Sequence, residues 1–166
     1  MTKDQCDMTA GFIGVGSNLD DPCGQVERAI ELLDEIPGTE LVARSSMYLS
    51  SPFGPVEQPD FVNAVAKLHT SLEASVLLQH LQEIERTQGR IAGMRWGPRV
   101  IDLDLLVFGD EVIDEPQLRV PHAGITERNF VLLPLQEIAP ELVIPGLGRV
   151  ADIAVDNSEP RISRIV

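Results

Sequence analysis

The chain has 166 residues, which favours one domain that buries about two-thirds of the surface of its unfolded state. Hydrophobic residues make up 43%, so we expect a folded core, and no apolar run approaches the ~20 residues that a membrane helix needs. The polar start is unlike a signal peptide, and the two cysteines suit a reducing compartment. We therefore expect a cytoplasmic single domain over residues 1–166, with a core at about residues 10–148 and a tail at 149–166.

The net charge is −13, with only two lysines against 26 acidic residues. This balance argues against a general nucleic-acid binder, which needs a basic surface to displace counterions. Four arginines nevertheless cluster in residues 86–99 (Arg86, Arg90, Arg95 and Arg99). A local positive patch on an acidic protein indicates a site for a small polyanion.

The first apolar run, residues 10–15, predicts a buried strand that ends in a turn at Gly16-Ser17-Asn18. A helix should follow, with Asp21 as its cap, Pro22 at its first position and Pro37-Gly38 as its stop. Its apolar face comprises Val26, Ala29, Ile30, Leu33 and Ile36.

Residues 41–49 predict a strand, and the proline-rich residues 51–59 an irregular loop. Residues 61–69 alternate, so that Phe61 and Asn63 share one face of a strand while Val62 and Ala64 share the other. Thr70-x-x-Glu73 resembles a capping box for a second helix ending near residue 89. Its inward side chains should be Leu77, Leu78, Leu81 and Ile84.

Residues 90–99 predict a loop and residues 100–108 a strand, after which residues 111–113 could pair back. Residues 130–138 predict a third helix. The element order is β-α-β-β-α-β plus C-terminal additions. This order predicts an α+β, ferredoxin-like fold, with an antiparallel sheet and two helices on one side.

The sequence Ile101-Asp102-Leu103-Asp104-Leu105 is the strongest chemical feature. Side chains alternate along a strand, so Asp102 and Asp104 should share a face, ~7 Å apart. Aspartate is disfavoured in strands, and a cation between the two carboxylates would relieve their repulsion. Mg²⁺ prefers such ligands, together with water and substrate phosphates. A solvated acidic edge strand is the alternative.

The sequence Arg95-Trp96-Gly97-Pro98-Arg99 directly precedes the acidic strand. Arginine binds phosphate oxygens in bidentate fashion, and cations beside a metal-binding acid pair suit phosphoryl transfer. The chain lacks a P-loop, a nucleophile elbow and a zinc cluster. Gly14-x-Gly16 predicts a tight turn that could also line the site. His122, Phe61 and Asn63 are candidates for ligand contacts, with ordinary structural roles as the alternative.

Five blocks occur in order: Gly16-Ser17-Asn18-Leu19, Ser45-Ser46-x-Tyr48, Gln58-Pro59-Asp60-Phe61-x-Asn63-Ala64, the Arg95–Asp104 block, and Val120-Pro121-His122. Together they resemble 6-hydroxymethyl-7,8-dihydropterin pyrophosphokinase of folate biosynthesis. The resemblance implies transfer of the β,γ-diphosphate of ATP to the hydroxymethyl group of the pterin, giving the pterin diphosphate and AMP.

The resemblance also implies site residues. Asp102 and Asp104 would hold two Mg²⁺ ions, and with Arg90 and Arg99 would form the catalytic set. The ATP-contacting residues would be Gln82, Glu85, Arg90, Arg95, Trp96, Arg99, Leu105, His122 and Arg128. The pterin-contacting residues would be Ser50, Phe53, Phe61, Asn63, Trp96, Asp102 and Phe130, with Phe61 and Phe130 stacked on the ring.

Some positions depart from the pattern of the family. Phe61 stands where Tyr is frequent, Ser50 where Thr is common, and Ala123 where an aromatic residue or Pro occurs. The change at Ala123 weakens any adenine contact carried over to that position.

Two other functions stay open on the residues alone. One is a ferredoxin-like ligand- or RNA-binding module, which the acidic pI and the lack of an aromatic RNA-binding pattern oppose. The other is a metal-dependent phosphatase or nuclease that uses the same acid pair. We expect small-molecule substrates, ATP and the pterin, with neither a nucleic-acid nor a membrane partner, and a monomer.

Overall fold

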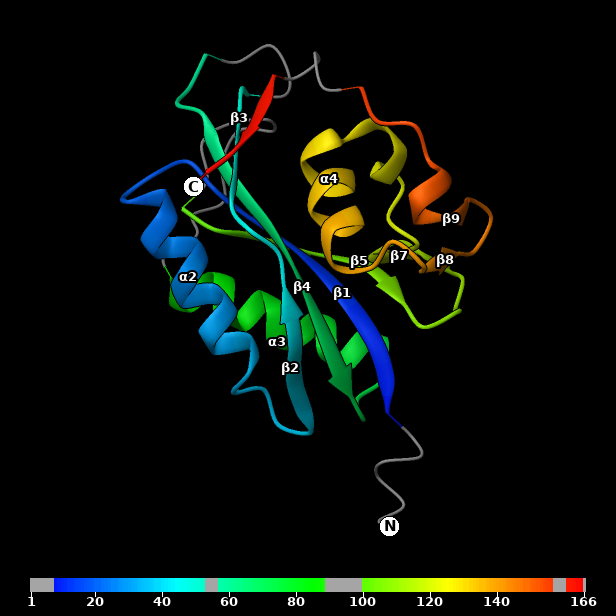
Figure 1. Ribbon diagram of the computed structural model, residues 1–166. Coiled ribbons are helices and arrows are strands. Elements are labelled where there is room, and N and C mark those ends of the chain that lie inside the picture. Colours follow the sequence, from blue (N-terminus) through cyan, green and yellow to red (C-terminus); the bar gives the residue numbers. More distant parts are fainter. Residues whose placement is uncertain (1–7, 53–56, 89–99, 157–160, 166) are drawn as a thin grey trace.

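The fold is built on one antiparallel sheet. The computed structural model describes residues 8–52, 57–88, 100–156 and 161–165. The strands of the sheet lie in the order β10-β3-β4-β1-β5, and β2 also pairs with β4 (Figure 1). Their bounds are β1 Thr9–Ser17, β2 Thr39–Arg44, β3 Tyr48–Ser50, β4 Phe61–Thr70, β5 Asp102–Phe108 and β10 Ile162–Arg164. Without β10, this is the ferredoxin-like order, which confirms the predicted fold class.

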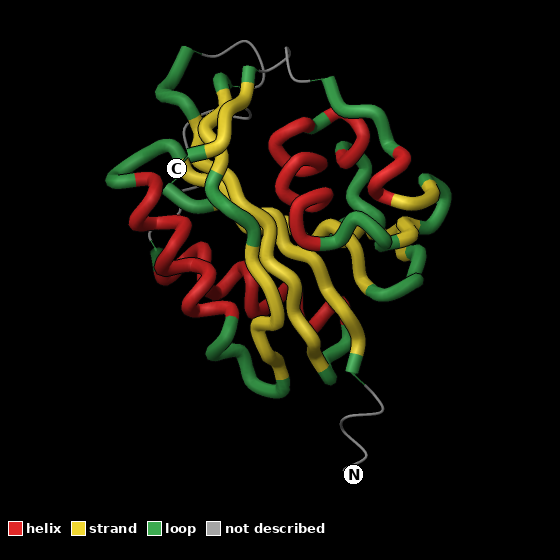
Figure 2. The backbone as a smooth tube through the Cα atoms, viewed as in Figure 1, coloured by secondary structure: helices red, strands yellow, loops and turns green. Residues whose placement is uncertain are grey.

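Helices cover both faces of the sheet. Helices α2 (Pro22–Leu33) and α3 (Ala74–Thr87) lie on one face, and α4 (Asn129–Ile138) lies on the other (Figures 1 and 2). Two short hairpins follow β5 and α4, namely β6 (Ile113–Glu115) with β7 (Leu118–Val120), and β8 (Val143–Ile144) with β9 (Gly148–Arg149). Short 3₁₀ turns occur at Ile125–Glu127 and Val150–Asp152.

The alternation of β4 divides the core into two parts, as the sequence predicts. Val62, Ala64, Ala66 and Leu68 point toward α2 and α3. Val65 points the other way and packs in the cluster formed with α4. Phe61 and Asn63 share the parity of Val65, so they belong to the face that α4 covers only in part.

The predicted strand at 41–49 is two strands instead. Ser45 interrupts it, because its Oγ accepts a hydrogen bond from the amide of Val65 at 2.9 Å while its own amide donates to the Val65 carbonyl. Both β2 and β3 still pair with β4. The break starts a fresh register, in which Tyr48 faces Asn63 and Ser50 faces Phe61.

Strand β1 is longer than predicted, and its glycines are not in a turn. Gly14 and Gly16 lie inside the strand, where Gly14 pairs with Asp104 and Gly16 pairs with Asp102. The prediction of a tight turn at these glycines was therefore wrong. Hydrogen bonding to strands on both sides extends β1 through Ser17.

Three other local predictions also need correction. Helix α2 ends at Leu33, and Ile36 is buried in the turn that follows it. The capping box before α3 does not form, because Thr70 belongs to β4 and bonds to Thr39, and Glu73 makes no side-chain cap. Residues 113–115 pair with β7 rather than with β5.

A bulge in β5 shifts the alternation of its side chains once along the strand. Phe12 pairs with Val107 and Ile13 pairs with Leu105, so Leu106 is the extra residue of a bulge. Leu103 and Leu105 enter the core under α2 and α3, whereas Leu106 and Val107 pack on the side of α4. The bulge lies beyond the two aspartates and leaves their alternation intact.

A carboxylate on α4 ties this helix to β3. Glu137 accepts hydrogen bonds from the Tyr48 hydroxyl at 2.7 Å and from the Ser46 amide at 2.9 Å. Partial burial favours a higher pKa for Glu137, but the hydrogen bonds from Tyr48 and Ser46 outweigh it and hold the pKa below its ordinary value. Burial, together with the Glu137 carboxylate, raises the pKa of Tyr48 to about 12.

The predicted C-terminal tail contains a short 3₁₀ turn and a strand of the main sheet. It passes α4, where Asn129 Nδ2 donates to the Asp156 carbonyl at 2.7 Å, and returns as β10 beside β3. In the parts of the chain that the structure describes, no helix is long and apolar enough to cross a membrane.

Candidate active site

Asp102 and Asp104 open β5 and point to the same side of the sheet. Both are half-buried, and they alternate with the buried Leu103 and Leu105 on the opposite face. This agrees with the alternation predicted from the sequence. The side that they share is the one on which α4 lies.

A cross-strand row connects the acid pair to Asn63. Asn63 on β4 pairs with Gly16 on β1, and Gly16 pairs with Asp102 on β5. Cross-strand partners project from the same face of a sheet. Asn63 and Asp102 are therefore two strand spacings apart, about 10 Å, with only a glycine between them.

The neighbourhood of Asn63 contains two more predicted pterin residues. Asn63 is only 6% exposed, and its Nδ2 donates to Ser50 Oγ at 2.8 Å. Ser50 pairs with Phe61, which is half-buried at the start of β4. Ser50, Phe61 and Asn63 therefore form one side of the candidate site.

Arg128 joins the acid pair to the second predicted stacking ring. Its Nη1 lies 3.9 Å from Asp104 Oδ2, and its guanidinium carbon lies 5.9 Å from the ring centre of Phe130. Arg128 directly precedes α4, and its carbonyl accepts from the amides of Val131 and Leu132. The start of α4 thus sets where this cation sits.

His122 stands close to the same charges. Its amide donates to the Leu106 carbonyl, and its Nδ1 accepts from the Gly124 amide at 3.1 Å. Burial and the nearby Arg128 lower the pKa of His122, and the opposing effect of Asp102 is smaller. A neutral ring that accepts at Nδ1 carries its proton at Nε2, so His122 can donate a hydrogen bond from that atom.

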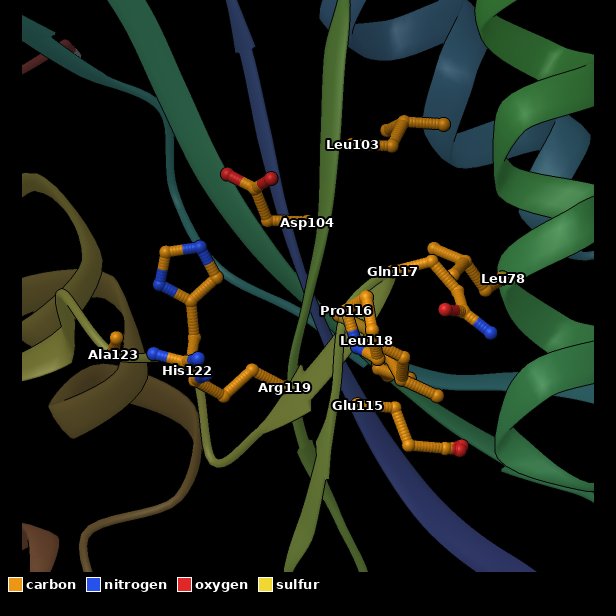
Figure 3. Close-up of a pocket in the computed structure, with 11 residues that line it drawn as sticks. Leu78, Leu103, Asp104, Glu115, Pro116, Gln117, Leu118, Arg119, His122 and Ala123 are labelled. Atoms are coloured by element: carbon orange, nitrogen blue, oxygen red, sulfur yellow. The ribbon is translucent and has the colours of Figure 1, made fainter.

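A pocket of about 310 Å³ curves around the free edge of β5. Figure 3 shows Asp104 and His122 on one side of this strand and Leu78 and Leu103 on the other. The β6–β7 hairpin lines the rest of the pocket with residues 115–119. The pocket brings together three residues of the predicted site: Asp104, Leu105 and His122.

The two predicted residues on α3 differ in their surroundings. Gln82 is exposed. Glu85 is only 5% exposed and accepts a hydrogen bond from the Leu103 amide at 2.8 Å. Leu103 lies between the two aspartates, so this contact fixes the backbone of β5 beside them.

Five predicted site residues lie outside the described residues: Phe53, Arg90, Arg95, Trp96 and Arg99. The arrangement of the arginine-rich segment relative to the acid pair therefore stays a prediction. Arg128 is the described arginine that approaches the acid pair.

The donor set suits Mg²⁺ carried by a phosphate ligand. Among the described residues, no cluster of three or more His, Cys, Asp or Glu side chains could hold a metal by protein ligands alone. Mg²⁺ commonly takes one or two carboxylates and completes its shell with phosphate oxygens and water. The guanidinium of Arg128 beside Asp104 shows that a positive charge fits at this position.

Comparison with known proteins identifies the family. A model of 7,8-dihydro-6-hydroxymethylpterin-pyrophosphokinase matches residues 12–140. The chain belongs to this family. It is 48% identical over 134 residues to the 2-amino-4-hydroxy-6-hydroxymethyldihydropteridine pyrophosphokinase of Pseudomonas aeruginosa, which covers 81% of this chain and 83% of that protein. It is 40% identical over 158 residues to the protein of that name from Haemophilus influenzae, covering 95% of this chain and 99% of the relative.

Solved structures agree on the fold. A HPPK-DHPS protein of Plasmodium falciparum, crystallised with pterin and p-hydroxybenzoate, superposes with a TM-score of 0.70 over 95% of this chain at 12% identity. The chain spans 47% of the length of that protein. At this level of identity the similarity concerns the fold alone.

Two features of the site were absent from the sequence-based set. One is the pocket lining from α3 and from the β6–β7 hairpin, including Leu78 and Arg119. The other is the position of Gly16 between Asn63 and Asp102. A strand glycine is a signal of close backbone or side-chain approach, and this signal was available in the Gly14-x-Gly16 pattern.

Proposed function

We propose that the chain transfers the β,γ-diphosphate of MgATP to the hydroxymethyl oxygen of 6-hydroxymethyl-7,8-dihydropterin, releasing AMP. The observation that carries the proposal is the shared face of Asp102, Asp104 and Asn63. The pairings of β1 with β4 and β5 bring the two carboxylates and the amide onto this face. The carboxylates suit a metal-bound phosphate chain, and the amide suits the edge of a heterocycle. Membership of the pyrophosphokinase family supports this assignment.

In this proposal the hydroxymethyl oxygen attacks the β-phosphorus. The bond from that phosphorus to the oxygen bridging the α- and β-phosphates breaks, AMP leaves with that oxygen, and the hydroxyl proton is lost. Bound Mg²⁺ would neutralise phosphate charge and lower the pKa of the hydroxyl. Asp102 and Asp104 would hold two such ions.

The described side chains contribute orientation and charge. His122 would donate from Nε2 to a phosphate oxygen, and Arg128 would move from Asp104 to the phosphates once the metal is present. The pocket around Leu105 and His122 would receive the nucleoside part of ATP. Transfer of this kind depends on in-line positioning and charge neutralisation more than on a protein nucleophile.

On the pterin side, Asn63 would hydrogen-bond the polar edge of the ring. An amide can both donate to and accept from such an edge. Phe61 and Phe130 would stack on the two faces, and Ser50 would support Asn63 from behind. Phe53, Arg90, Arg95, Trp96 and Arg99, together with Gln82 and Glu85 on α3, complete the proposed set.

The direct test is to mix the protein with MgATP and 6-hydroxymethyl-7,8-dihydropterin and to follow AMP and the pterin diphosphate by liquid chromatography. We expect AMP only when both substrates and Mg²⁺ are present. Release of inorganic phosphate from ATP without the pterin would instead indicate the metal-dependent phosphatase.

A further inference from the structure

Gly16 occupies an unusual place for a glycine. It is the second-last residue of β1, is hydrogen-bonded to strands on both sides, and its φ is not in the left-handed region. A glycine inside a strand weakens it by roughly 0.5–1 kcal/mol relative to alanine. The backbone therefore gives no reason for glycine here, and the reason must lie in what a side chain would meet.

A side chain at position 16 would meet Asn63. A Cβ built on Gly16 would lie 2.9 Å from Asn63 Oδ1, closer than such atoms approach in folded proteins. The next atoms, Asn63 Cγ and the Val62 carbonyl oxygen, are both 3.9 Å away, which is ordinary contact. The conflict is thus confined to the oxygen of the Asn63 amide.

Asn63 cannot easily move away from this conflict. Its side chain is only 6% exposed, and its Nδ2 is hydrogen-bonded to the buried hydroxyl of Ser50 at 2.8 Å. Rotation of the amide would break that bond inside a closely packed region. The amide nitrogen is therefore fixed by its bond to Ser50 on β3, and the amide oxygen occupies the space above Gly16.

We propose that Gly16 is a positioning residue for pterin recognition: it leaves the space in which the Asn63 amide lies, across β1 and facing Asp102. The inference rests on the proposed function, in which Asn63 contacts the ring and Asp102 the reacting end of the substrate. Gly16 thereby helps to set the distance between ring recognition and the metal-binding carboxylate.

Gly14 provides a matched control in the same strand and on the same face. The three atoms nearest to a Cβ at Gly14 all belong to the Leu106 side chain, at 3.4–3.6 Å, which is ordinary contact. None of these three atoms is polar, and none lies closer than an ordinary van der Waals contact. Gly14→Ala therefore tests for effects of an added methyl group in β1 that do not involve Asn63.

The binding experiment titrates 6-hydroxymethylpterin into the protein with Mg²⁺ and a non-hydrolysable ATP analogue, followed by calorimetry. We expect Gly16→Ala to weaken pterin binding at least about tenfold and Gly14→Ala to change it less than about twofold. In an Asn63→Ala background, Gly16→Ala should cause no further loss. Unchanged pterin affinity in Gly16→Ala would overturn the inference.

Thermal unfolding of the same variants gives a readout that needs no ligand. We expect Gly16→Ala to lower the melting temperature by about 5 °C in the wild-type background and by less than about 1 °C in the Asn63→Ala background. Equal losses in both backgrounds would show that the clash is not with Asn63 and would refute the inference. If the wild-type protein fails to bind the pterin at all, the proposed function fails, and the unfolding cycle still shows whether Gly16 leaves the space that the Asn63 amide occupies.

Discussion

Asn63 on β4 and Asp102 on β5 lie in the same cross-strand row, on either side of Gly16 in β1. Strand β1 pairs with β4 on one side and with the edge strand β5 on the other. A site whose polar groups rise from paired strands keeps its distances better than a site built only on loops. This relationship places the acid pair and the proposed pterin side on one set of paired strands.

The acid pair should be essential to turnover and dispensable for folding. Asp102→Ala and Asp104→Ala should each lower kcat at least about a thousandfold, because the phosphates lose their metal. Both side chains are half-buried at one end of the sheet, so the melting temperature should stay within a few degrees of the wild type. Steady-state AMP formation and thermal unfolding measure the two effects.

Asp110→Ala is the control for these variants, since Asp110 is an exposed acid in the turn after β5. It should have wild-type activity. Substantial turnover by either Asp102→Ala or Asp104→Ala would remove the metal assignment.

Arg128 should act mainly on the nucleotide. Its guanidinium lies beside Asp104 and makes no side-chain cap on α4, so Arg128→Ala should leave the helix in place. We expect the KM for MgATP to rise about tenfold, with a smaller change in the KM for the pterin. Arg149→Ala, in an exposed ion-pair cluster with Asp152, is the matched control. A change confined to the KM for the pterin would show that Arg128 serves Phe130 instead.

Glu85 is a candidate nucleotide-binding residue, and we expect it also to stabilise β5 through its hydrogen bond with the Leu103 amide. Glu85→Ala would leave the Leu103 amide without its acceptor, at a cost of about 2 kcal/mol in the free energy of unfolding. Glu85→Gln keeps an acceptor oxygen and should lose less than half of that. Chemical denaturation of the three proteins measures the difference. Equal stability of Glu85→Ala and the wild type would contradict the supporting role.

The contact between Glu137 and Tyr48 should make stability depend on pH. Since the pKa of Glu137 is lowered in the folded protein, its contribution is complete above the ordinary value of about 4.5 and is lost as the pH falls through the folded pKa. Glu137 is exposed to solvent, so we discount the contact to about 1 kcal/mol. Tyr48→Phe should thus be less stable than the wild type at pH 7, and the difference should shrink below pH 4. If the stability difference between Tyr48→Phe and the wild type stays constant from pH 7 to below pH 4, the Glu137 carboxylate is not its source.

Much of the fold could be predicted because the spacing of apolar residues along the chain reflects which side chains are buried. The alternation of β4 and the inward face of α3 follow directly from apolar spacing, and Asp102 and Asp104 follow from the same rule. The break at Ser45 could not be predicted, because it depends on a hydrogen bond to Val65, which is 20 positions away in sequence. The capping box failed for a similar reason, since pairing with Thr39 draws Thr70 into β4.

The site shows the same limit. His122, Asn63 and the acid pair could be named from motifs, but the sequence does not state that Gly16 stands between two of them. That relationship is a matter of strand register, which is fixed by pairings between distant segments. Likewise, the pocket wall from residues 115–119 depends on a hairpin that pairs with itself rather than with β5.

The most direct test of the proposed transfer follows the β-phosphorus of ATP. ATP radiolabelled at its β-phosphorus is incubated with the protein, Mg²⁺ and 6-hydroxymethyl-7,8-dihydropterin, and the products are separated by chromatography. We predict that the label appears in the pterin product while unlabelled AMP accumulates. Label that remains in ADP, or that appears as free phosphate or diphosphate without the pterin, would contradict it.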